Sequence, residues 1–243
     1  MYRGSTKEHS DPLMRTYLED LIYRLSETSE VRDRRFEFII LEDESINAFA
    51  APGGIIGINL GMFLNTKREG ELASVMCHEL AHLSQRHYAR SQNRSSPLAN
   101  ALMILGSIAV AAASRNPEAI MIAPAAMQQM SINYTRSNEK EADRIGFNNL
   151  VKAGFDPNDM TMMFQRMQDK YQREGSEQFS YLMTHPLPSE RLTDMRIRAD
   201  NISKPSEGSF RDNLDFYFMQ KRSEIWAEKD TKELIKKYKK DLE

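Results

Sequence analysis

Residues Val75 to Leu83 read V-M-C-H-E-L-A-H-L and carry the strongest structural signal in the sequence. Within it, His78 and His82 are four residues apart, and Glu79 directly follows the first histidine. Because side chains at positions i and i+4 of a helix lie on one face, both imidazoles can reach a single metal ion. Apolar residues with helical spacing predict a helix from Glu69 to about Ser91: Leu72, Val75, Met76, Leu80 and Leu83.

This H-E-x-x-H pattern suits zinc chemistry. Zn²⁺ binds imidazole nitrogens at about 2.0–2.1 Å. Glu79 lies beside the ligand face, where it can take a proton from zinc-bound water, whose pKa the metal lowers to about 7. The alternative is a chance match on a surface helix, since only three positions are fixed. The apolar neighbours disfavour it, and so does the presence of only five histidines in 243 residues.

A zinc site of this kind needs a third ligand from elsewhere in the chain. One zincin signature places a glycine three residues and a histidine six residues after the second motif histidine, but Gln85 and Tyr88 stand there. His87 is one position off and is expected on the helix surface. The pattern therefore excludes that class of site.

A carboxylate on a later helix is the other common solution, and the segment N-E-K-E-A-D at 138–143 offers three. Glu139 and Asp143 are four apart and share a helix face, whereas Glu141 points away. Glu139 is predicted as the third ligand, and Asp143 as the acceptor for the free N–H of His78, which fixes the tautomer of the ligand. The alternative is a solvated, charged helix with i,i+4 pairing.

Composition excludes several other classes. Lys and Arg total 33 against 35 Asp and Glu, a formal net charge of -2, which disfavours nucleic-acid binding. The single cysteine, Cys77, allows no intramolecular disulfide and no cysteine-rich metal cluster. The first twelve residues contain no apolar h-region, so no signal peptide is expected, although a leader removed earlier would leave the same sequence.

The chain is expected to be α+β and predominantly helical. A helix is predicted over Pro12 to Glu27, then short strands over Arg35–Glu42, Asn47–Ala50 and Ile55–Leu60 that form a small, largely antiparallel sheet. Helices follow from Glu69 onward. The predicted domains are 1–202, a linker at 203–210, and a helical C-terminal appendix at 211–243.

Two motifs together resemble a known family. H-E-L-A-H at 78–82 joined to N-E-x-E-A-D at 138–143 resembles the zinc metallopeptidases that include HtpX and the CAAX prenyl protease, which are gluzincins. Further segments are similar to its soluble periplasmic, BepA-like branch, and with those motifs they span most of 40–200: N-A-F-A-x-P-G-G at 47–54, H-E-L-x-H-L-x-Q-R-H at 78–87, E-A-D-R-I-G at 141–146, G-F-D-P at 154–157 and T-H-P-L-P-x-x-R at 184–191.

The resemblance implies a zincin-like metallopeptidase domain with an H-E-x-x-H active-site helix. It implies one zinc ion held by His78, His82 and Glu139, with Glu79 as general base and Asp143 as the partner behind a ligand. It also implies a periplasmic metalloendopeptidase that cleaves misfolded or misassembled envelope proteins. The alternative is a chaperone or assembly factor for outer-membrane proteins that cleaves rarely. Residues 211–243 would then be the start of a truncated tetratricopeptide array.

Three further features become candidates in that context. Asn47, Ala48, Phe49 and Ala50 are expected to form an edge strand that binds an extended substrate by β-augmentation, the alternative being a plain hairpin. His185 is a candidate oxyanion donor, or a fourth zinc ligand that holds the enzyme off. Arg191 is a second candidate for stabilising the oxyanion.

The segment 95–135 is nearly uncharged and leaves several interpretations open. It reads as core helices, as a lid over the cleft, or as a surface that meets the membrane or an outer-membrane assembly machine. It is too interrupted by polar and small residues for a membrane span of about 20 apolar residues.

Overall fold

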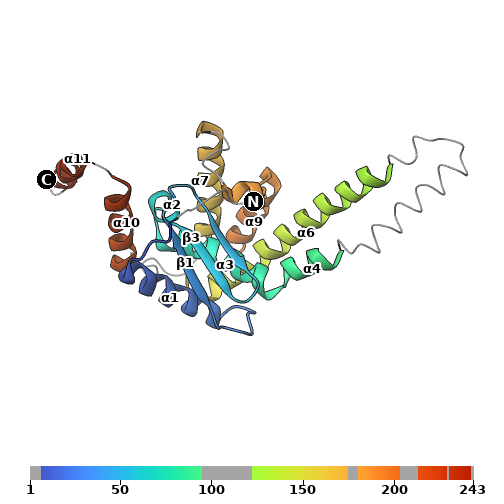
Figure 1. Ribbon diagram of the computed structural model, residues 1–243. Coiled ribbons are helices and arrows are strands. Elements are labelled where there is room, and N and C mark those ends of the chain that lie inside the picture. Colours follow the sequence, from blue (N-terminus) through green and yellow to red (C-terminus); the bar gives the residue numbers. More distant parts are fainter. Residues whose placement is uncertain (1–6, 95–121, 175–179, 203–212, 229, 242–243) are drawn as a thin grey trace, which may run out of the picture.

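A computed structural model describes residues 7–94, 122–174, 180–202, 213–228 and 230–241. Its architecture is α+β and mostly helical, as predicted, with a small sheet against a group of helices (Figure 1). The core lies between α1 (Pro12–Glu27), the sheet and α3 (Glu69–Ser84). Asp11 begins α1 by accepting from the backbone N–H of Leu13, and Pro12 suits the first helical position.

The sheet has three strands in the order β1-β3-β2, comprising β1 (Glu37–Leu41), β2 (Ala48–Ala51) and β3 (Ile55–Asn59). The prediction of a largely antiparallel sheet is wrong in part, because β1 pairs with β3 in parallel and only β2 with β3 is antiparallel. The tight turn at Pro52–Gly54 fixes the β2–β3 pair, with Gly53 and Gly54 at φ +92° and +83°. The longer connection before β2 leaves β1 free to pair with the other side of β3.

The predicted helix from 69 to about 91 is two helices. α3 ends at Ser84, and α4 begins at His87 and ends at Arg94. Between them Arg86 adopts a φ of +53°, which ends the α3 hydrogen-bond ladder and redirects the chain. This break becomes important for the site, because it sets where His87 lies.

The long helix α6 (Ile122–Lys152) packs against α3 and runs outward beside α4 (Figure 1). It ends at Lys152, and Gly154 just beyond it has a φ of +86°, the left-handed conformation expected after a helix. α7 (Asn158–Glu174) packs against α3, and α9 (Ser189–Asp200) packs against α7 and α6. The sequence did not predict two short helices, α2 (Leu60–Asn65) and α8 (Ser180–Thr184).

The C-terminal part contains α10 (Leu214–Ala227) and α11 (Thr231–Asp241). α10 packs against α1 and α2, where Phe216 and Met219 join the hydrophobic core. The division at 202 and 211 stays a prediction.

The proposed lid or membrane surface at 95–135 lies almost wholly outside the residues whose side chains the structure describes. Within the described ranges, no helix combines the length and the apolar character needed to cross a bilayer.

Candidate metal centre

Four predicted residues converge on one point. His78, His82, Glu139 and His185 each offer a donor atom, and these atoms lie within 4.8 Å of one another. The Nε2 atoms of His78 and His82 are 2.9 Å apart. Glu139 places Oε2 3.4 Å from His78 Nε2 and Oε1 3.3 Å from His82 Nε2. The structure therefore brings the three predicted ligands together, and His185 with them.

The packing of α3 against α6 sets this geometry. Gly146, two turns beyond Glu139, lies against the α3 backbone: a Cβ there would be 3.0 Å from the N and Cα atoms of His78. Such a close approach lets a glutamate on one helix reach imidazoles on the other. Cys77, next to the first ligand, is buried on another side of α3, as expected of a packing residue.

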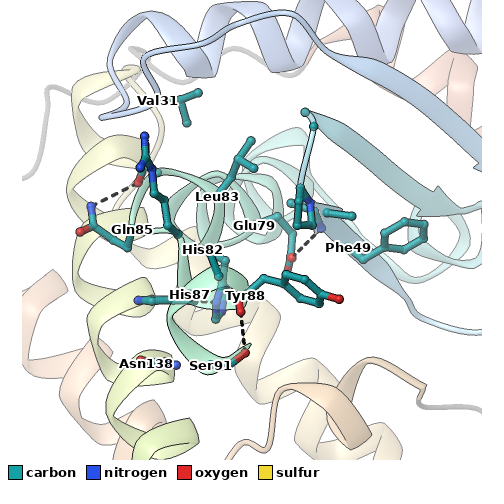
Figure 2. A pocket seen from close by; sticks show the side chains of 18 of the residues that line it. Val31, Phe49, Glu79, His82, Leu83, Gln85, His87, Tyr88, Ser91 and Asn138 are labelled. Carbon is teal, nitrogen blue, oxygen red and sulfur yellow. Dashed lines mark hydrogen bonds between the residues drawn. The ribbon is translucent and has the colours of Figure 1, made fainter. Parts of the chain in front are cut away.

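Glu79 faces the edge strand. Its Oε2 accepts a hydrogen bond of 3.1 Å from the backbone N–H of Ala50 in β2 (Figure 2). Its Oε1 is buried without a hydrogen-bond partner among the described residues, 3.6 Å from His185 Nε2. One carboxylate oxygen is thus held by the strand, and the other is left for a proton or a ligand.

The predicted edge strand is present, one residue later than expected, at Ala48–Ala51. The hydrogen bond from Asn59 N to Asn47 O directs the backbone groups of Asn47 toward β3. Because these directions alternate along an antiparallel pair, the backbone groups of Ala48 and Ala50 point away from β3. The side chain of Phe49 covers Gly57 on β3.

Asp143 lies behind the first ligand, and its role as acceptor for the N–H of His78 stays a prediction. Its Oδ1 is 3.0 Å from His78 Nδ1, the ring nitrogen that faces away from the other ligands. Burial lowers the pKa of His78, but its contacts with Asp143 and Glu139 outweigh burial and raise that pKa to about 9. Burial dominates at His82 and lowers its pKa to about 4.

The prediction that Arg191 stabilises the oxyanion does not fit its position. Its guanidinium is 3% exposed and binds Asp143 through Nε and Nη2, at 2.6 and 2.7 Å. Nη1 lies 2.9 Å from Glu139 Oε2 and donates to the Pro186 carbonyl. All its donor groups thus face protein carboxylates or backbone, so Arg191 holds two carboxylates in place.

His185 sits at the mouth of the cluster. Its Nδ1 is 3.1 Å from Glu139 Oε1, and its ring stacks on Tyr181 with centroids 4.5 Å apart and planes at 25°. Tyr181 is buried at the start of α8, a helix that the sequence did not predict. Stacking fixes the direction of the His185 ring, so the loop does not hold it by backbone alone.

The expectation for His87 is wrong, because the side chain is buried rather than on the helix surface. Its Nδ1 is 2.8 Å from His82 Nδ1, and its Nε2 is 3.0 Å from Glu141 Oε2. Helical periodicity misses this contact, because a spacing of five residues places side chains about 140° apart on one helix. The break at Arg86 brings His87 back over His82.

A cleft of 1310 Å³ opens onto the cluster. Glu79 and His82 line it, together with β2 and the start of α4 (Figure 2). His185 and the β2–β3 turn complete the lining. Phe49, Ala50 and Ala51 of β2 form part of its wall.

The donor set fits a metal ion. Two imidazole nitrogens and a carboxylate are the ligands that zinc accepts in hydrolytic sites, and they meet here on facing helices. Burial opposes ionisation of Glu139, but its contacts with the three histidines hold its pKa well below the usual range, so it stays anionic.

This H-E-x-x-H helix, its facing glutamate and an adjoining edge strand define a metallopeptidase site. The family model for peptidase family M48 matches residues 12–199. The chain belongs to peptidase family M48.

Curated relatives agree with that assignment. The chain is 45% identical to a putative beta-barrel assembly-enhancing protease of Vibrio cholerae over 204 residues, which are 82% of this chain and 42% of that protein. It is 39% identical to the beta-barrel assembly-enhancing protease of Escherichia coli over 228 residues, which are 91% of this chain and 45% of that protein. It is 27% identical to the mitochondrial metalloendopeptidase OMA1 of Schizosaccharomyces pombe over 197 residues, 79% of this chain and 56% of that protein. The chain thus spans less than half the length of the two bacterial relatives.

Proposed function

We propose that this chain is a zinc-dependent endopeptidase. The observation that carries the proposal is the convergence of His78, His82 and Glu139 beside Glu79, at the base of a cleft edged by a β-strand. The Ala50 carbonyl on the strand at its edge points away from β3, where an extended chain can pair with it, while the Ala50 N–H is held by Glu79. A purely structural zinc site would need neither the cleft nor this edge.

Each residue then has a task. When bound, zinc polarises the scissile carbonyl and lowers the pKa of water. Glu79 accepts the proton of the attacking water on Oε1 while the Ala50 N–H holds Oε2, and it then passes that proton to the leaving amine. Asp143 fixes His78, and Arg191 holds both Asp143 and Glu139.

His185 acts as a gate in this proposal. Its ring lies between Glu79 and Glu139 and belongs to the same donor cluster, so in this position it occupies space that a substrate carbonyl needs. We propose that this is a resting form with His185 as a fourth ligand. A swing of the 185–188 loop would open the site. The alternative role for His185 is donation to the oxyanion, and the two roles predict opposite effects of His185→Ala on cleavage.

The substrates and place of action follow the relatives. Proteins named for beta-barrel assembly share 39–45% identity with this chain, so we propose misfolded or misassembled envelope proteins as substrates and the periplasm as the compartment. An outer-membrane assembly machine, or the membrane surface, is proposed as a partner through 95–135. The competing role is a chaperone that cleaves rarely, and the position of His185 in the donor cluster is what favours it.

The test is cleavage of unfolded casein by the zinc-loaded chain and its Glu79→Gln variant. We expect the variant to lose at least about 10²-fold in kcat/KM, the usual contribution of a general base, while it keeps one zinc per chain. Glu190→Gln, an exposed change on α9, is the matched control and keeps full activity. A wild-type chain that binds no zinc would refute the proposal. Cleavage that persists in Glu79→Gln would refute the role of Glu79.

A further inference from the structure

The break between α3 and α4 creates a contact that a continuous helix would not allow. Arg86, at φ +53°, turns the chain so that His87 begins α4 directly over the second predicted ligand, His82. Figure 2 shows the two side chains together at the end of α3. Their ring centroids are 4.8 Å apart with planes at 78°, an edge-to-face arrangement in which one ring nitrogen points at the other.

A chain of polar contacts leads away from His82. His82 Nδ1 is 2.8 Å from His87 Nδ1, and His87 Nε2 is 3.0 Å from Glu141 Oε2. Arg90, one turn along α4, donates to the same Glu141 oxygen at 3.1 Å. His87 is 4% exposed, so its ring nitrogens depend on these partners rather than on water.

The positions of the ring hydrogens of His82 and His87 follow from the geometry of the metal site. Because His82 turns Nε2 toward His78 and Glu139, a bound metal takes the lone pair of that nitrogen, and Nδ1 must carry the hydrogen. Nδ1 of His82 then donates to His87 Nδ1, which must accept. The hydrogen of neutral His87 is therefore on Nε2, where the Glu141 carboxylate accepts it. With these tautomers, the ring N–H groups of both His82 and His87 have an acceptor.

We propose that His87 is a positioning residue for the metal centre, which holds His82 in the tautomer and orientation needed for metal binding, with Glu141 and Arg90 behind it. The inference rests on the proposed metal site. The proposal also gives several residues of α6 one shared role, the support of the metal centre. They supply the third ligand, Glu139, and the carboxylates that complete the support of both histidine ligands, Asp143 directly and Glu141 through His87.

The support of the two ligands differs in kind. His78 faces a carboxylate directly, whereas His82 faces a neutral imidazole that relays to one. Partners of this kind around a metal ligand affect metal affinity by about 10- to 100-fold. His87 thus ties the orientation of His82 to the start of α4.

The experiment measures the zinc dissociation constant by chelator competition for the wild type and three variants of the whole chain. His87→Phe keeps a ring but removes the acceptor, and we expect zinc binding to weaken by about 10- to 100-fold. His87→Gln restores an acceptor for His82 and a donor for Glu141, and should recover most of the affinity. Tyr88→Phe, a neighbouring exposed change on α4, is the control and should leave the constant unchanged.

A second measurement needs no substitution. A long-range ¹H–¹⁵N spectrum of the zinc-loaded wild type reports which ring nitrogens carry hydrogens. We expect His82 protonated at Nδ1 and His87 protonated at Nε2 alone. A His87 protonated at Nδ1, or a constant for His87→Phe within twofold of wild type, would overturn this inference while the zinc site stands. A wild type without zinc would overturn both proposals.

Discussion

At the scale of single residues, the centre depends on charges that are buried and matched. Glu139 and Asp143 are anionic on α6, and the guanidinium of Arg191 contacts both of them. Burial raises the pKa of Asp143, but its contacts with His78 and Arg191 outweigh burial and lower it. Such a network is costly to break at one member, because each remaining charge would lose its partner away from water.

His185 gives a prediction at this scale. His185→Ala removes the ring that lies between Glu79 and Glu139, so we expect casein cleavage to rise by roughly an order of magnitude if the resting form is mostly closed. Zinc content should stay at one per chain, since His78, His82 and Glu139 remain. Cleavage rates and metal analysis on the same samples check it. A loss of cleavage with zinc retained would instead assign His185 to oxyanion stabilisation.

At the scale of elements, the approach of α6 to α3 sets the distance between ligands. Gly146→Ala tests this distance, because two effects of the added methyl group oppose each other. Alanine stabilises an isolated helix by up to about 1 kcal/mol relative to glycine, whereas its Cβ would press on the α3 backbone at His78. We expect the contact to dominate and to destabilise the fold by about 1–3 kcal/mol, with weaker zinc binding. Urea unfolding and chelator competition measure the two effects. Asn148→Ala on the exposed side of α6 is the control, and a more stable Gly146→Ala would contradict the close-packing argument.

The junction of α3 and α7 carries a pH dependence. Asp159 is buried against Gly70 at the start of α3, and burial, with Asp156 and Glu71 nearby, raises its pKa to about 7 although Arg68 opposes this. The unfolded chain releases this proton near pH 4, whereas the folded chain holds it until about pH 7. Stability from this group is therefore full below pH 4 and is lost as the pH rises to about 7.

Asp159→Asn removes that titration. The variant should gain stability relative to wild type between pH 5 and pH 8, by about 1–4 kcal/mol at the upper end, because a shift of one pKa unit corresponds to about 1.4 kcal/mol. Unfolding curves at fixed zinc concentration across this range check it. A difference in unfolding free energy between variant and wild type that stays constant with pH would show that Asp159 titrates normally.

At the scale of the whole molecule, the C-terminal helix α10 is joined to the elements that carry the candidate metal centre. Phe216 packs beside Tyr17 of α1, with ring centroids 6.4 Å apart, and Gln220 donates to the Phe63 carbonyl of α2. Asn213, which caps α10, donates to Glu69 at the start of α3. The contacts link the predicted appendix to the helix that carries the two histidine ligands.

Phe216→Ala tests this link. Truncating a buried phenylalanine costs about 3 kcal/mol, which lowers Tm by roughly 6–12 °C in a chain of this size. Phe218→Ala is the matched control on the same helix, since its side chain is 55% exposed. Calorimetry should show one transition that moves as a unit. Separate transitions for α10 and the core would instead support an independent C-terminal domain.

Residue types and their spacing were enough to predict the donor set of the candidate metal centre. The four-residue spacing of His78 and His82 places both on one helix face, and the same periodicity put Glu139 and Asp143 together on a second helix. Local rules also located α1 and the three strands to within a few residues, since caps, turns and apolar periodicity act over short distances.

Features that depend on contacts between distant or redirected segments could be read only from the folded molecule. The sheet is mixed because β3 lies in space between β1 and β2, although both come before it in the sequence. Arg191 faces Asp143 and Glu139 rather than a substrate, and His87 reaches His82 only because the chain turns at Arg86. Periodicity describes side-chain directions within one helix, so it predicts which residues share a face, and it carries no information about how separate helices are oriented once packed.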